Sequence, residues 1–336
     1  MASPRVLKIT GPSPALSFRM ELLSEVNPEV VNNLLSIIPV ESFLLHVVIA
    51  GETFYMPVPS FSLSSKNMVQ RRKGVVYYNT GSQSICFCYG AVTESTMVNQ
   101  FAVVLEDDLP RMEELGKVVY EQTINCRIPK IVTLTIRAAD DNLSSSPAIM
   151  TSTILGNQLD GSWTSAKMLI DEECAQLRLP VEPDDIKKIR LGAITARAAD
   201  EGSPFQAAVF LQGFLSTLGP HVFARLLAVS RYAEMTVPLM VRQTREFLVE
   251  TFNHFEFMGD LGLCRIAELG RVYEKALDKL NTVEEYRQLT DSMRTLVQLH
   301  YRWLHLVFPW YLKDQFQART PEEVANMPKL EKYSAK

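Results

Sequence analysis

Residues Gly74–Gly90, GVVYYNTGSQSICFCYG, decide the fold, because they join two β-forming runs through a turn-forming break. Val75–Asn79 and Ile85–Tyr89 are rich in β-branched and aromatic residues, and Thr80–Gln83 has the composition of a short hairpin loop. An isolated hairpin is only marginally stable in water, so it needs partner strands. Further short apolar runs supply them: Phe18–Leu23, Phe43–Ala50, Thr53–Val58, Phe101–Leu105 and Lys130–Arg137. We therefore expect one sheet or barrel in this half of the chain.

Two helices are expected among these strands. Asn27 is placed as an N-cap, Pro28 suits the first helical turn, and Pro39 marks where the helix should have ended. Its apolar stripe consists of Val30, Val31, Leu34, Leu35 and Ile38. Asp107 or Asp108 would cap a second helix, whose stripe is Met112, Leu115, Val118 and Val119.

The periodicity becomes helical from Pro204 onward. Gly219 and Pro220 are expected to separate a first helix from a second, and Thr236 with Pro238 marks a later start. Thr282 and Glu285 have capping-box spacing, and Pro309 should end the long apolar helix that follows. The second half is thus predicted to be an antiparallel helical bundle.

Turn-rich segments, Asp140–Ser146 and Gly156–Ser165, predict a connecting region with little core of its own. The predicted class is α+β, with a barrel at residues 1–137, a connection at 138–203 and a bundle with a short tail at 204–336. Two domains agree with a length of 336 residues.

Composition narrows the class of protein. A net charge of −4 and a pI near 5.8 favour neither a nucleic acid nor an anionic membrane as a partner. No apolar run is judged long enough to span a membrane, and the first residues, MASPRVLKITGPSP, lack a signal-peptide core. We therefore expect a soluble cytoplasmic protein. Whether it forms a homo-oligomer is left open.

Motifs for cofactors and metals are largely missing from the sequence. GDLG at Gly259–Gly262 lacks the third glycine of a dinucleotide fingerprint, and neither a Walker A loop nor a G-x-S-x-G elbow occurs. His300 and His305 are five residues apart and do not share a helix face. Cys86 and Cys88 share a strand face, but no second pair accompanies them. We therefore expect neither a cofactor nor a metal.

Several blocks of the chain resemble known families. NPEVVNNLLSIIPVES from Asn27, GETFYMPVP from Gly51, KGVVYYNTGSQSICFCYG from Lys73 and VNQFAVVLED from Val98 resemble, in this order, blocks of bacterial cyclophilin-like proteins. The helical half, with RWLHLVFPWYL at Arg302–Leu312, resembles the C-terminal bundle of cucumopine and mikimopine synthases. Together the two resemblances cover most of the chain and imply a cyclophilin-like β-barrel followed by an all-α bundle.

The resemblance to cucumopine and mikimopine synthases implies a non-reductive opine synthase. Such an enzyme joins L-histidine to 2-oxoglutarate and closes a ring in a Pictet-Spengler condensation. The missing dinucleotide fingerprint agrees with a reaction that transfers no hydride. The chemistry needs a proton donor, a base, and cationic or amide groups for three carboxylates.

Candidate site residues are polar positions on or beside apolar strands. The proposed catalytic residues are Glu21, His46, Tyr89 and Glu94, and the proposed substrate-binding residues are Arg71, Asn99 and Gln100. Each also has a structural interpretation. Arg19 and Glu21 suit a solvated strand face, His46 and Tyr89 suit hydrogen-bonded core positions, and Glu94 suits an exposed loop. Arg71 belongs to a charged run, Arg71–Lys73, that suits a solvated surface.

Two other functions remain compatible with the sequence. A cyclophilin-like fold is compatible with peptidyl-prolyl isomerase activity, although fold alone does not determine function. A catalytically silent protein that binds a small molecule or a partner is the second alternative.

Overall fold

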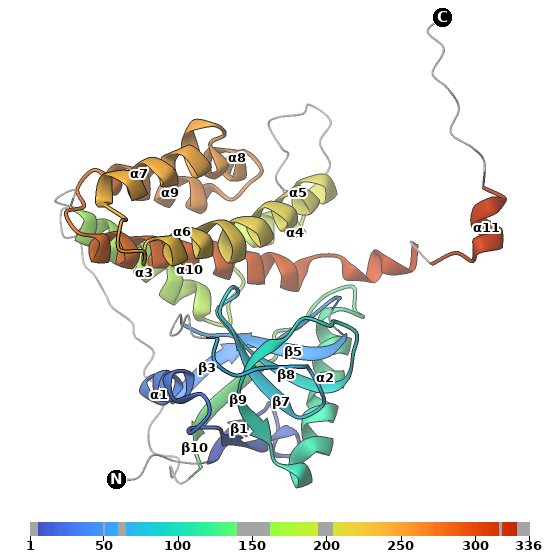
Figure 1. Ribbon diagram of the computed structural model, residues 1–336. Helices are drawn as coiled ribbons and strands as arrows, with labels where there is room; N and C mark the ends of the chain where they lie inside the picture. The colour runs from blue at the N-terminus through green and yellow to red at the C-terminus, as the bar shows by residue number, and fades with distance from the viewer. Residues whose placement is uncertain are drawn as a thin grey trace, which may run out of the picture.

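The computed structural model describes residues 6–49, 51–59, 65–139, 162–193, 204–315 and 318–327. Its N-terminal part is a nearly closed antiparallel barrel-like sheet, and its C-terminal part is a helical bundle (Figure 1). The strand order is β3-β10-β1-β2-β9-β7-β8-β5-β4, with β6 paired to β9. This architecture confirms the predicted α+β class.

Ten strands make up the sheet. They are β1 (Val6–Thr10), β2 (Phe18–Leu22), β3 (Val40–Phe43), β4 (Leu45–His46), β5 (Gly51–Pro57), β6 (Met68–Val69), β7 (Val75–Asn79), β8 (Ser84–Val92), β9 (Val98–Val104) and β10 (Thr133–Ala138). The β7–β8 hairpin is confirmed, with Tyr77 opposite Cys86 and Asn79 opposite Ser84. The single strand expected over Phe43–Ala50 is instead divided, because β3 pairs with β10 whereas β4 pairs with β5.

The inner face of the sheet forms one hydrophobic core with two helices, α1 (Pro28–Ile37) and α2 (Leu109–Thr123). Phe54 and Phe87 stack at its centre, with ring centroids 5.0 Å apart. Val30, Val31 and Leu34 of α1 are buried in it, as the predicted stripe requires. Asp108 occupies the N-cap position of α2, but its carboxylate makes no capping bond and accepts hydrogen bonds from Arg19 instead.

The bundle is built around the long helix α10 (Val283–Val307). The surrounding helices are α3 (Trp163–Arg178), α4 (Asp184–Arg190), α5 (Pro204–Thr217), α6 (Ala224–Val229), α7 (Val237–Arg245), α8 (His254–Asp260) and α9 (Cys264–Leu277). A 3₁₀ turn, Trp310–Gln315, and a short helix, α11 (Pro321–Ala325), follow α10. The capping box of Thr282 and Glu285 is confirmed, and α10 ends just before Pro309 as expected.

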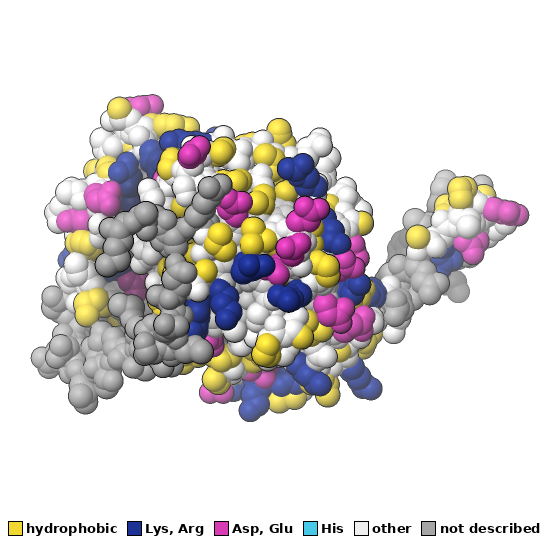
Figure 2. All heavy atoms as spheres, turned by 90° about the horizontal axis from the view of Figure 1, so that it is seen from below, with side chains coloured by type: hydrophobic (Ala, Val, Ile, Leu, Met, Phe, Trp, Pro, Cys, Tyr) yellow, Lys and Arg dark blue, Asp and Glu magenta, His cyan; other side chains and the backbone are white. Residues whose placement is uncertain are grey.

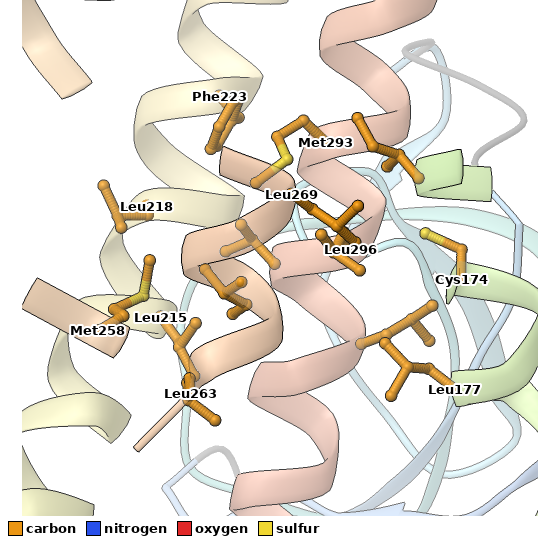
Figure 3. Packing of buried hydrophobic residues seen from close by; sticks show 14 of the residues in the cluster. Cys174, Leu177, Leu215, Leu218, Phe223, Met258, Leu263, Leu269, Met293 and Leu296 are labelled. Carbon is orange, nitrogen blue, oxygen red and sulfur yellow. The ribbon is translucent and has the colours of Figure 1, made fainter. Parts of the chain in front are cut away.

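The connecting region differs from the prediction. Residues 138–203 were expected to have little core, yet α3 and α4 bury Ile170, Cys174 and Ile186 in the bundle core. Figure 3 shows Cys174 and Leu177 of α3 beside Leu296 of α10. Their helical spacing gives α3 an apolar face that α10 covers. The domain boundaries themselves stay a prediction, and the turn-rich Asp140–Ser146 lies outside the described residues.

The expected break at Gly219 and Pro220 is also wrong. A π-helical segment, Leu218–Phe223, carries the chain from α5 into α6, so Pro204–Val229 forms one helix. An 18-residue window of it has a mean hydropathy of 1.3, which corrects the expectation that no apolar run reaches spanning length. Leu211 and Leu215 of this helix are fully buried in the bundle core. The core helix of a soluble protein can be as long and as apolar as a membrane-spanning helix.

The barrel and the bundle meet where the β7–β8 loop touches α10. Arg294 donates to the carbonyl oxygens of Thr80 and Gly81, and Gln298 Nε2 donates to Gly81 O over 2.7 Å. Gln83 Nε2 donates to Thr295 Oγ1 over 2.9 Å. This set of contacts fixes the hairpin against the bundle.

Figure 2 shows one face of the molecule, on which acidic and basic side chains are intermixed. Neither sign of charge dominates this face.

Candidate active site

Arg71 and Glu94 form an ion pair at one end of the barrel. Arg71 follows β6, which pairs with β9. Glu94 follows β8, which pairs with β7. Arg71 Nη2 lies 3.1 Å from Glu94 Oε2. The Arg71 side chain is 6% exposed whereas that of Glu94 is 38% exposed, so the carboxylate opens to solvent from a nearly buried cation.

Arg71 is held by three further contacts. Its Nη1 donates to Thr96 O, and its Nε donates to the Tyr77 hydroxyl over 3.4 Å. Its guanidinium carbon lies 5.4 Å from the centroid of the Tyr77 ring. Burial opposes the charge on Arg71, but Tyr77 and Glu94 outweigh that effect and leave the pKa of Arg71 raised. Burial raises the pKa of Tyr77, so its hydroxyl stays protonated.

His46 and Tyr89 form a second pair, which lines a cavity of about 370 Å³ between β4, β5, β8 and α2. The Nε2 atom of His46 lies 2.9 Å from the Tyr89 hydroxyl, and its Nδ1 lies 2.5 Å from Val47 O. A carbonyl only accepts, so Nδ1 carries the proton and Nε2 accepts from Tyr89. Burial lowers the pKa of His46 to about 4, so the ring is neutral near pH 7.

Sequence reasoning missed other residues of this cavity. Tyr120 on α2 packs its ring 5.0 Å from that of His46, and Glu52 on β5 also lines the space. Lys313 donates to the Tyr120 hydroxyl over 2.5 Å. Tyr120 lies one residue beyond the predicted apolar stripe, and that position was the one signal that could have identified it.

Of the other predicted residues, Glu21 lies apart from both pairs, whereas Asn99 and Gln100 lie on β9 beside β6 and β7. Glu21 is half-buried on β2, three strands from β8, on the face opposite to Phe18 and Met20. Asn99 Oδ1 accepts a hydrogen bond from Asn27 Nδ2 over 2.8 Å. Asn27 is the predicted N-cap residue of α1, so this bond joins the start of α1 to β9. Gln100 is buried opposite Tyr77, and its Nε2 donates to Ala102 O.

A metal site is not evident in the described part of the chain, where no three His, Cys, Asp or Glu side chains cluster. Cys86 and Cys88 are buried on β8, and burial is the main cause that raises the pKa of each thiol. Both thiols are therefore protonated near neutral pH.

Comparison with protein families identifies the bundle. Residues 173–307 match the family model of the cucumopine synthase C-terminal helical bundle domain. The resemblance to the cucumopine synthase family is confirmed for this domain. The match begins inside α3, in agreement with the packing of that helix against α10.

The fold is also found in a solved structure. McbB, whose structure is in complex with tryptophan, is 20% identical over 93% of this chain and 100% of its own, with a TM-score of 0.81. The two proteins therefore share the barrel-and-bundle fold. The hypothetical protein AF2241 from Archaeoglobus fulgidus is 18% identical over 41% of this chain and 98% of its own, with a TM-score of only 0.31. No curated protein sequence matches the chain.

Proposed function

We propose that this protein is a Pictet-Spengler-type enzyme whose chemistry occurs at Arg71 and Glu94. The observation that carries this proposal is the pairing of a nearly buried guanidinium with a partly exposed carboxylate, 3.1 Å apart. A guanidinium binds a substrate carboxylate in a bidentate manner, and the carboxylate beside it offers a proton acceptor at the same place.

The family of the bundle and the fold of McbB support this assignment. The bundle is similar to that of cucumopine synthases, and McbB shares the whole fold and was solved with tryptophan. Tryptophan and histidine are both amino acids whose side chain is an aromatic heterocycle with a nucleophilic carbon. The finer proposal is an opine synthase that condenses L-histidine with 2-oxoglutarate to cucumopine or mikimopine.

The proposed reaction has four steps. The amine of histidine attacks the ketone carbon of 2-oxoglutarate, and the resulting carbinolamine loses water to give an imine. The imidazole carbon Cδ2 then attacks the imine carbon, which forms the new C–C bond and closes the ring. A base finally removes the proton from Cδ2 and restores the aromatic ring. No electrons are exchanged with a cofactor, and one water is the only by-product.

Glu94 is assigned the proton transfers in this sequence. Its partly exposed carboxylate is within reach of a bound substrate, and the last step requires a base of this kind. Arg71 binds a substrate carboxylate and so holds the reacting carbon near Glu94. Holding both substrates in position contributes roughly 7 to 11 kcal/mol to lowering the barrier. His46 and Tyr89 are assigned no step in this proposal, because the cavity that they line includes neither Arg71 nor Glu94.

The test is an incubation of the protein with 2-oxoglutarate and either L-histidine or L-tryptophan, followed by mass spectrometry. We expect a histidine product whose mass equals that of the two substrates less one water, without NADH or NADPH and in the presence of a chelator. A product with tryptophan but not with histidine would support a Pictet-Spengler-type enzyme and reject the opine synthase proposal. No product with either amine would reject the enzyme proposal.

The remaining expectations on partners and location stay proposals of the same kind. We propose small-molecule partners rather than nucleic acids or membranes. We also propose that the protein is cytoplasmic, and a homo-oligomer is compatible with both proposals. Size-exclusion chromatography with light scattering measures the last of these directly.

A further inference from the structure

Arg302 is a buried cation on the side of α10 that faces the barrel. Its guanidinium carbon lies 4.6 Å from the centroid of the Tyr55 ring and 4.8 Å from that of Tyr301. Its Nη1 donates to the Tyr55 hydroxyl over 3.1 Å, and its Nη2 donates to Ser82 O over 3.2 Å. The residue is only 5% exposed.

The charge on Arg302 has no anionic partner among the described residues. No carboxylate of the described chain lies within ion-pair distance of it, and its buried Nε atom has no hydrogen-bond partner there. Arg294, two turns earlier on α10, has Asp291 at 3.5 Å, and Arg71 has Glu94. A buried charge without a counter-charge is costly, so a site of this kind favours an anion from outside the chain.

Arg302 and Arg71 lie over the same row of the barrel. Tyr55, Cys86 and Tyr77 are direct neighbours on β5, β8 and β7, and their side chains share the outer face that the bundle covers. Arg302 stacks on the first and Arg71 on the last of them. Strand β8 lies between β5 and β7, and neighbouring strands are about 4.8 Å apart. The Cα atoms of Tyr55 and Tyr77 are therefore about 10 Å apart.

The thiol of Cys86 lies within the electrostatic influence of both cations. Burial raises the pKa of Cys86 to about 12, and Arg302 and Arg71 both act in the opposite direction. Both guanidinium groups therefore lie close enough to Cys86 to lower the pKa of its thiol.

The row is almost, but not completely, buried. Tyr55, Cys86 and Tyr77 are 3–4% exposed although the bundle lies over them. Phe54 and Phe87, which are their neighbours on the inner face, are 0% exposed. The outer row is therefore slightly less enclosed than the inner face of the same strands.

We propose that Arg302 is the residue that selects a dicarboxylic 2-oxo acid, by binding its distal carboxylate while Arg71 binds the carboxylate next to the ketone. This inference rests on the proposed function and adds the bundle to the substrate site. The row of Tyr55, Cys86 and Tyr77 lies between the two cations, so a dicarboxylate bound by both would lie across it.

The test compares 2-oxoglutarate with pyruvate, which lacks the distal carboxylate. Steady-state kinetics with L-histidine are measured for the wild type, Arg302→Lys and Arg302→Met. Arg294→Lys is the matched control, because Arg294 is a buried arginine of the same helix that contacts the hairpin loop instead of the row. A thermal melt of each variant checks that the fold is intact.

We expect Arg302→Met to raise KM for 2-oxoglutarate about tenfold or more, Arg302→Lys to have a smaller effect, and pyruvate kinetics to change little. Equal effects on both oxo acids, or an effect as large for Arg294→Lys, would overturn the assignment. If the wild type turns over neither oxo acid, the proposed function fails. Calorimetric binding of 2-oxoglutarate and pyruvate to the same variants then decides the role of Arg302 separately.

A crystal structure of the wild type with 2-oxoglutarate provides the second measurement if the variants do not fold. A carboxylate within hydrogen-bond distance of the Arg302 guanidinium would support the inference. Both carboxylates bound away from Arg302 would reject it.

Discussion

Glu94 is a partly exposed carboxylate that pairs with the nearly buried guanidinium of Arg71. The sequence places it in a polar loop, where a solvated surface carboxylate is the ordinary expectation. The structure adds the contact with Arg71, which is 23 positions earlier in the chain and nearly buried. The ion pair makes this loop carboxylate half of the site that we propose to bind a substrate carboxylate and to accept a proton.

Replacing Glu94 tests this assignment at the residue itself. Glu94→Gln removes the base but keeps the shape of the side chain, so kcat should fall roughly 100-fold or more while the melting temperature stays nearly constant. Glu21→Gln is the matched control, because Glu21 lies three strands from β8 and should keep wild-type kinetics. Wild-type turnover in Glu94→Gln would move the proton transfers to another residue.

The buried histidines predict how stability depends on pH. Burial lowers the pKa of His46 and of His305 to about 4, below the unfolded value of about 6.5. The unfolded state therefore binds more protons between these values, so stability is complete above pH 6.5 and falls as the pH drops toward 4. Each histidine contributes a slope of about 1.4 kcal/mol per pH unit in that window.

Urea unfolding at several pH values between 5 and 6 measures this slope. His46→Gln should make it shallower by about 1.4 kcal/mol per pH unit, because one proton-binding group is removed. An unchanged slope would mean that His46 is protonated in the folded protein. Paired carboxylates such as Asp108 lose their contribution at lower pH and should not obscure the comparison.

Contacts between residues that are far apart in the chain could not be predicted from the sequence. His46 and Tyr89 are each identifiable as polar positions in apolar strands, yet their contact depends on β4 pairing with β5 and β5 with β8. Arg302 was included in a sequence block of the bundle, and nothing in the helical period distinguishes it from a surface arginine. Its role as a buried cation follows from the way α10 lies against the barrel.

Single elements were predictable where a local chemical signal is strong. The capping box at Thr282 was predictable because hydrogen bonds to backbone N–H groups follow directly from the spacing of Thr and Glu. The break at Gly219 and Pro220 was not, because a π-helical segment accommodates the missing N–H of proline within a continuous helix. Residues of α3 were assigned to a connection because turn-forming neighbours obscured their helical period.

Removing the cap measures how much one helix start stabilises the fold. Thr282→Ala leaves the first N–H groups of α10 without their side-chain acceptor and should lower the free energy of unfolding by about 1 kcal/mol. Thr320→Ala removes the same box from α11, which has no buried residue, and should have no measurable effect. Urea unfolding monitored by circular dichroism compares the two variants. Equal effects would contradict the view that α10 organises the bundle.

At the scale of the whole molecule, the hairpin contacts make the barrel and the bundle one unit. Limited proteolysis should first cut between Asp140 and Gly161, since that segment is rich in turn-forming residues. The two fragments should then elute together in gel filtration, because Arg294, Gln298 and Gln83 join the hairpin to α10. Fragments that separate without denaturant would show that the contact does not hold the site together.

We propose that the protein forms a carbon–carbon bond between a heterocyclic amino acid and a 2-oxo acid. The most direct measurement uses L-histidine deuterated at Cδ2, incubated with 2-oxoglutarate and analysed by mass spectrometry. We predict a product that has lost one water and the deuteron, because the new bond replaces the C–D bond at that carbon. A product that retains the deuterium, or one that forms only with NADPH, would contradict it.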